Sequence, residues 1–112
     1  MSLSVRGRAE SVFFHEVKNG TEYTKRCENA LLIGGTCMGV ARHDFFNHVR
    51  ADFVIVDEAG QTTEPITLGP LFHGDKFILV GDPKQLPPLI LSRKARQNGA
   101  GVSLMERLCK VS

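Results

Sequence analysis

The stretch FVIVDEAGQ, residues 53–61, decides the fold because it joins an apolar run to two adjacent acids. Four consecutive apolar residues are typical of a strand that is covered on both faces of a parallel sheet. Asp57 and Glu58 follow at the point where this strand ends. Adjacent carboxylates repel each other and attract a cation. The stretch therefore predicts an interior strand that carries a functional site at its end.

Two further apolar runs, ALLIGG at 30–35 and FILVG at 77–81, have the same character. The gaps between the three runs hold 17 residues (36–52) and 20 residues (57–76), each long enough for a helical crossover between parallel strands. We therefore expect an α/β fold in which a parallel sheet has flanking helices in a three-layer αβα arrangement.

Each gap contains a segment with helical character. The first segment, 42–51, would place Phe45, Phe46 and Val49 on one face. In the second, 62–72, Thr62 or Thr63 is suited to cap a helix whose first turn contains Pro65.

The remaining segments give one helix and one loop. Ser103 followed by Glu106 forms a capping-box pattern, which predicts a terminal amphipathic helix. Three prolines within residues 81–101 predict a rigid loop there. Residues 1–29 fit either a hairpin that turns at Asn19-Gly20 or a helix broken at that point.

Composition excludes several classes of protein but selects no function. The chain has 112 residues, 42% of them hydrophobic and 23% charged, as in ordinary globular domains. The net charge of +2 gives little general attraction for nucleic acid. The three cysteines lack the spacing of a metal site, and the sequence contains no signal peptide or membrane-length apolar run. An intracellular protein is expected.

Polar clusters follow all three apolar runs: GGTC at 34–37, DEAGQ at 57–61 and GDPKQLPP at 81–88. In a parallel sheet they would share one edge, where ligands bind. An acid pair there suits hydrolysis of a nucleoside triphosphate, with Asp57 holding Mg²⁺ and Glu58 activating water. The amide of Gln85 would sense the γ-phosphate. Taken singly, each cluster is better explained as an exposed loop or turn.

The segments VIVDEAGQTTEPITLGPLF and FILVGDPKQLPPLIL resemble motifs II and III of superfamily-one helicases, in the branch that includes the nonsense-mediated-decay helicases. Within that branch, GGTCMGV, LGPLF and SLMERL are most similar to the eukaryotic replication helicase-nucleases that trim Okazaki flaps. The resemblance covers about residues 30–109 and includes motif Ic at GGTC.

The resemblance implies roles for seven residues. In the ATPase site, Asp57 would coordinate Mg²⁺, Glu58 would be the general base and Gln85 would contact the γ-phosphate of ATP, while Gln61 and Asp82 would support that network. Thr36 and Gly35 would contact single-stranded DNA or RNA, although the family usually has Ala-Thr where this chain has Gly34-Gly35.

The sequence contains no G-x-x-x-x-G-K-[ST] phosphate loop. We therefore expect residues 30–112 to form part of the first RecA-like motor domain of a longer nuclear protein, with residues 1–29 as a separate N-terminal segment. The resemblance also implies a second motor domain and a nuclease domain, with its iron–sulfur cluster, outside this chain. Because the strand of the phosphate loop would lie beside 77–81, we expect an exposed apolar edge at that strand.

Three alternatives remain open at this stage. The track could be RNA, as in related helicases. The chain could be an inactive interaction module that keeps the fold, although such a module has no need for an acid pair. Finally, Asp57, Glu58 and Asp82 could form a two-metal nuclease site. In every reading the isolated chain is expected to be inactive as an ATPase.

Overall fold

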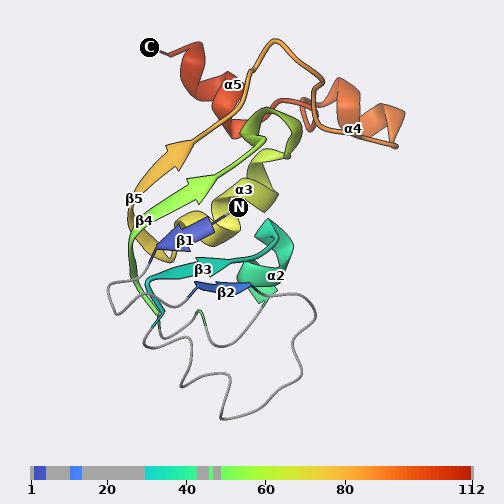
Figure 1. Cartoon of the computed structure of the whole chain (residues 1–112). Helices are drawn as coiled ribbons and strands as arrows, with labels where there is room; N and C mark the ends of the chain where they lie inside the picture. Colours follow the sequence, from blue (N-terminus) through green and yellow to red (C-terminus); the bar gives the residue numbers. More distant parts are fainter. Residues whose placement is uncertain (1, 5–10, 14–29, 43–45, 47–48, 112) are drawn as a thin grey trace.

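A five-stranded sheet organises the chain in the computed structural model, which describes residues 2–4, 11–13, 30–42, 46 and 49–111 (Figure 1). The strand order is β2-β3-β1-β4-β5. The strands are β1 (Ser2–Ser4), β2 (Ser11–Phe13), β3 (Leu32–Gly34), β4 (Ala51–Val56) and β5 (Gly74–Leu79).

The strands β3, β4 and β5 correspond to the three apolar runs, and all three run in the same direction. β4 pairs with β5 in parallel, with Val54 beside Phe77 and Val56 beside Leu79. β2 likewise pairs with β3 in parallel. The predicted parallel α/β fold is therefore confirmed.

The sequence did not predict β1. This strand lies between β3 and β4 and is antiparallel to both. Ser2, for example, pairs with Gly34 on one side and Ile55 on the other. A strand in this position gives hydrogen-bonding partners to the facing edges of β3 and β4. Its three-residue sequence, SLS, is too short to show an apolar period.

The helix after β4 is confirmed. The short helix η2 (Ala59–Gln61) follows the acid pair, and α3 (Glu64–Leu71) begins after Thr63 at the N-cap, with Pro65 in its first turn. The backbone carbonyl of Thr63 accepts hydrogen bonds from the amide and hydroxyl of Thr67, which is fully buried.

Two other helices differ from the sequence prediction. α2 (Cys37–Arg42) begins immediately after the GGT cluster, five residues before the expected segment 42–51. Phe46 is buried and Val49 packs against the core, whereas Phe45 lies outside the described residues. The expected rigid loop contains α4 (Arg93–Gln97), because the side chain of Ser92 caps a segment that has no proline.

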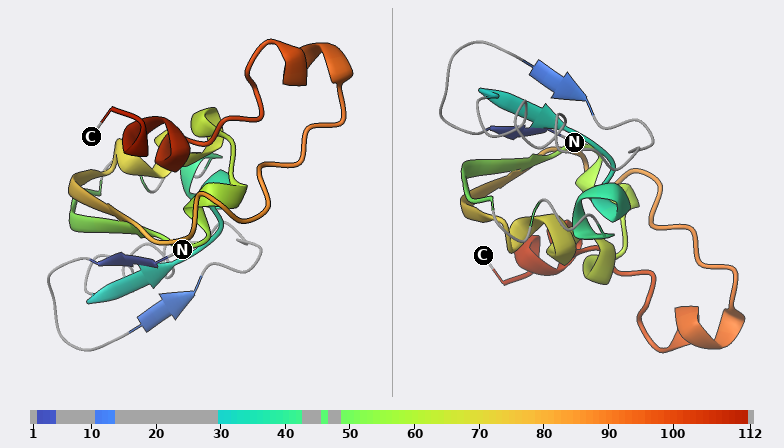
Figure 2. Two further views of the ribbon diagram at one scale, coloured as in Figure 1. Left: turned by 90° about the horizontal axis from the view of Figure 1, so that it is seen from above. Right: turned by 90° about the horizontal axis from the view of Figure 1, so that it is seen from below.

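The core lies between the sheet and the helices. It is formed by side chains of β3, β4 and α2 together with Phe46, and its fully buried members include Ile33, Val54 and Val56. Burying an aliphatic side chain of this size contributes about 1.5–3 kcal/mol. The described helices α2, α3 and α5 (Leu104–Cys109) lie on the same side of β4 and β5 in both views of Figure 2. The second helical layer of the predicted αβα arrangement is not seen among the described residues.

β5 forms one edge of the sheet and, in the described part of the chain, pairs only with β4. Phe77, Ile78 and Val80 are 44–50% exposed along this edge. The predicted apolar edge is thus present. Separately, none of the described helices has the length and apolar character needed to cross a membrane.

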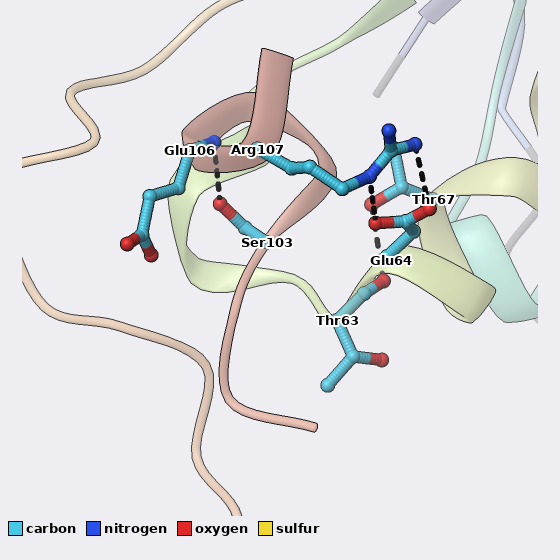
Figure 3. A network of polar contacts seen from close by, with 6 residues as sticks. All are labelled: Thr63, Glu64, Thr67, Ser103, Glu106 and Arg107. Atoms are coloured by element: carbon cyan, nitrogen blue, oxygen red, sulfur yellow. Dashed lines mark hydrogen bonds and ion pairs between the residues drawn. The ribbon is translucent and has the colours of Figure 1, made fainter. Parts of the chain in front are cut away.

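Figure 3 shows the ion pair of Arg107 with Glu64, which connects α5 to α3. The guanidinium of Arg107 donates two hydrogen bonds to Glu64, at 2.7 and 2.8 Å. The hydroxyl of Ser103 accepts the amide of Glu106 at 3.1 Å, as the capping pattern predicted, and Ser103 forms an isolated bridge with Thr63. The Arg107–Glu64 pair and the Thr63–Ser103 bridge join two helices that are far apart in sequence.

The Arg107–Glu64 pair should make stability depend on pH. The hydrogen bond from Arg107 lowers the pKa of Glu64 below its ordinary value, and the carboxylate raises the pKa of Arg107. A lowered folded-state pKa contributes stability that is present above the unfolded value, about 4.3, and is lost as the pH falls through the folded value.

We expect Glu64→Gln to reduce the loss of stability between pH 7 and pH 3, measured by urea unfolding. In an Arg107→Ala background, the same replacement should no longer change that pH dependence. An unchanged pH dependence in the single variant would contradict the interpretation.

Candidate functional site

Three loops emerge from the carboxyl ends of β3, β4 and β5 and bring the predicted residues to one edge of the sheet. Gly35 and Thr36 follow β3, while Asp57, Glu58 and Gln61 follow β4. Asp82 and Gln85 follow β5. Because these strands are parallel, the loops share the edge at which α/β folds bind ligands.

Asp57 and Glu58 have separate hydrogen-bonding partners although they are neighbours. Asp57 Oδ1 accepts the backbone amide of Glu58 at 3.0 Å, and Glu58 Oε2 accepts the side-chain amide of Gln61 at 2.9 Å. The backbone amide of Gln61 also donates to the backbone carbonyl of Glu58 at 3.0 Å. All three side chains are exposed. Gln61 therefore orients the Glu58 carboxylate.

Glu58 adopts a strained backbone conformation. Its φ of 52° and ψ of 38° place it in the left-handed region, and among the described residues it is the only one other than glycine with a positive φ. Residues held in this way cost of order 1–3 kcal/mol and cluster at functional sites. The fold therefore holds this acid in a conformation that a purely structural turn would assign to Gly or Asn.

The loop after β5 is a tight turn organised by Asp82. Asp82 Oδ1 accepts the amide of Lys84 at 2.8 Å, and its backbone carbonyl accepts the amide of Gln85 at 3.2 Å. Its second carboxylate oxygen lies 3.4 Å from the side-chain nitrogen of Gln85. Asp82 thus positions Gln85 from both the backbone and the side chain.

The loops after β4 and β5 are packed directly against each other. The amide of Ala59 donates to the carbonyl of Val80 at 2.9 Å, which extends the β4–β5 pairing into the loops. A Cβ on Gly60 would lie 2.9 Å from the carbonyl oxygen of Asp82. Gly81 has a φ of +148°, and a Cβ there would lie 3.2 Å from the Ala59 nitrogen.

Sequence reasoning did not identify Gly60 and Gly81 as part of the site. The available signal was their position, because each lies within one of the polar clusters at a strand end. A glycine in such a place marks a close backbone approach.

Thr36 lies at the same edge but on a separate element. Its hydroxyl accepts the amide of Gly39 at 3.0 Å and its carbonyl accepts the amide of Val40, so it caps α2. Among the described residues the hydroxyl proton of Thr36 has no acceptor, so it can donate to an external one. Strand β1 separates β3 from β4, and within the described chain no hydrogen bond joins Thr36 to the other two loops.

The acids fit a single divalent cation better than a pair of metals. Asp57 Oδ2 has no hydrogen-bonding partner among the described residues and is exposed at the strand end. Mg²⁺ commonly takes one or two carboxylates and completes its shell with water and phosphate oxygens. Within the described ranges, no three His, Cys, Asp or Glu side chains gather closely enough to hold a metal. The two-metal nuclease interpretation of Asp57, Glu58 and Asp82 stays a prediction.

Comparisons with known proteins agree with this geometry. A family model described as an AAA domain matches residues 10–93. The chain is 54% identical over 77 residues to the DNA replication ATP-dependent helicase/nuclease DNA2 of Xenopus laevis and 53% identical over 78 residues to that of Homo sapiens. These matches cover 69% and 70% of this chain and 7% of each relative.

A third relative is also named as a helicase. The probable helicase senataxin of Mus musculus is 59% identical over 59 residues, which cover 52% of this chain and 2% of senataxin. The resemblance to superfamily-one helicases is thereby confirmed. The chain spans about 7% of the length of the DNA2 relatives named above.

The strain at Glu58 gives a test of the site's geometry. We expect Glu58→Gly to keep the free energy of unfolding or raise it by up to about 1 kcal/mol, because relief of the left-handed backbone offsets the lost Gln61 contact. The matched Glu106→Gly change, in the regular helix α5, should lower it by about 1 kcal/mol. Urea unfolding measures both variants. Equal destabilisation by the two changes would contradict the strained conformation.

Proposed function

This chain belongs to the AAA domain family, and we propose that it supplies the magnesium-binding and water-activating half of the ATPase site in a DNA helicase of the DNA2 type. The observation that carries the proposal is the acid pair at the end of β4, where a strained Glu58 is oriented by Gln61. An interaction module without catalytic activity would gain nothing from that strain.

The proposed chemistry assigns one task to each carboxylate. Bound Mg²⁺ would supply positive charge that offsets the charge of the triphosphate. Asp57 would hold it through the free oxygen Oδ2. Glu58 would accept the proton of the water that attacks the γ-phosphorus, and the bond between that phosphorus and the oxygen bridging to ADP would break.

The amide residues would complete this arrangement. Gln61 holds one oxygen of Glu58, so the proton acceptor keeps a fixed orientation. Asp82 holds Gln85 in its turn, and we propose that this amide contacts the γ-phosphate. Loss of that phosphate would then be sensed in the loop after β5.

Thr36 and Gly35 are our candidates for contact with a single-stranded nucleic-acid backbone. Thr36 caps α2 with its carbonyl and its oxygen lone pairs, which leaves its hydroxyl proton for a phosphate oxygen. We propose DNA as the track because two of the relatives above are named for DNA replication. RNA remains the alternative.

The wider context is proposed from the relatives' names. A helicase/nuclease of DNA replication would act in the nucleus and would include a nuclease unit. An iron–sulfur cluster stays a prediction that rests on the sequence resemblance alone. The remainder of the helicase would be the main partner of this segment.

Replacement of Glu58 tests the proposal in a working motor. In the Xenopus laevis relative, the matching segment can be exchanged for residues 30–109 of this chain. We expect the hybrid to hydrolyse ATP, and Glu58→Gln to lower kcat about 10²–10⁴-fold with nucleotide binding retained, because the proton acceptor is lost. Steady-state ATPase assays measure the change.

The matched control is Glu106→Gln, which makes the same chemical change in α5, outside the loops that carry the candidate site. This variant should have a kcat within about twofold of the kcat of the unsubstituted hybrid. A Glu58→Gln hybrid with undiminished ATPase activity would show that the general base lies elsewhere.

The isolated chain should bind ATP only weakly and should not hydrolyse it. Its sequence contains no phosphate loop, so the triphosphate would meet the acid pair without the backbone amides and lysine that normally neutralise it. Isothermal titration calorimetry with Mg-ATP measures the affinity. Binding in the micromolar range would contradict the division of the site proposed above.

A further inference from the structure

Helix α5 packs against the loops that follow β4 and β5. It packs against η2, which contains Gln61 and follows Glu58 directly. Leu104 is 3% exposed, and Met105 is packed against the core. The sulfur of Met105 lies 3.5 Å from the position that a Cβ on Gly81 would occupy, at the base of the Asp82 turn. One short helix therefore supports the elements that carry Glu58 and Gln85.

The position of α5 depends on a connection to α3 rather than on its own length. Six residues are too few for a helix that is stable by itself. Arg107 reaches Glu64 on the first turn of α3 through two parallel hydrogen bonds, and the planar fork fixes the orientation as well as the distance (Figure 3). The Thr63–Ser103 bridge lies at the start of both helices.

We propose that Arg107 and Glu64 are positioning residues for ATP hydrolysis: their ion pair seats α5 against η2 and the Gly81 turn and so keeps Glu58 and Gln85 in register. This inference rests on the function proposed above. Neither residue would touch the reacting atoms. Both act through the placement of α5.

The energetics separate this role from simple stabilisation. The side chains of Arg107 and Glu64 are 51% and 27% exposed, so their ion pair contributes only a small, pH-dependent share of the free energy of unfolding. Catalysis is far more sensitive to position, because a displacement of about 1 Å at the reacting groups can cost about 10²-fold in rate. Loss of the pair should therefore appear in kcat before it appears in stability.

The test uses a full-length Xenopus laevis hybrid that carries residues 30–112 of this chain, so that Arg107, Glu64 and Lys110 are all present. Arg107→Ala and Glu64→Ala should each lower the kcat for ATP about 10-fold or more, with KM for ATP within about twofold. The double variant should be no slower than either single variant, because all three lack the same interaction. Arg107→Lys keeps the charge but loses the fork, and should restore only part of the rate.

Lys110→Ala is the matched control. Lys110 pairs with Glu106 at 2.7 Å inside α5 and connects it to no other element, so its removal should leave kcat unchanged. Thermal unfolding of each variant gives the folded fraction at the assay temperature, and rates are compared per folded molecule.

Three results would overturn the inference: an unchanged kcat in Arg107→Ala, losses that multiply in the double variant, or a loss that disappears on correction for the folded fraction. The Glu58→Gln hybrid separates this failure from a failure of the proposed function. If Glu58→Gln abolishes hydrolysis while Arg107→Ala has no effect, the site stands and only the positioning role is lost.

Discussion

The arrangement of the candidate site depends on the hydrogen bond from the Ala59 amide to the Val80 carbonyl, which joins the loops after β4 and β5. It continues the pairing of β4 with β5 beyond the last strand residues, so the loops inherit the spacing of the sheet. Gly60 and Gly81 permit this approach because any side chain at either position would meet backbone atoms of the opposite loop. Main-chain geometry therefore sets the positions of the two loops, and side-chain contacts then orient the carboxylate of Glu58 and the amide of Gln85.

Glu58 shows how this frame sustains an unfavourable local conformation. The buried residues Val56 and Ala59 anchor the chain on both sides of the acid pair, and Glu58 is the member of the pair that adopts the left-handed conformation. Gln61 then fixes the direction of the carboxylate. The cost falls on a residue that a stability criterion alone would replace with glycine. Retaining glutamate there is understandable if the carboxylate performs a reaction.

Much of this arrangement was predictable from local patterns, because continuous apolar runs mark β4 and β5, and Thr63 with Pro65 marks the start of α3. The site acids followed from their position at strand ends. The predictions failed where the outcome depends on other parts of the chain. β1 has only three residues and is placed by the two strands beside it, α4 was hidden by nearby prolines, and α2 begins at a cap supplied by Thr36. The roles of Gly60 and Gly81 required the distance between two loops, which no single stretch of sequence contains.

The exposed edge at β5 links the solubility of this segment to the pairing of that strand with another one. Its outward N–H and C=O groups have no strand beside them in the described chain, and Phe77, Ile78 and Val80 line the same border. Such an edge recruits any compatible strand, including that of another copy. The solubility of this segment should therefore depend on which strands are available to pair with β5.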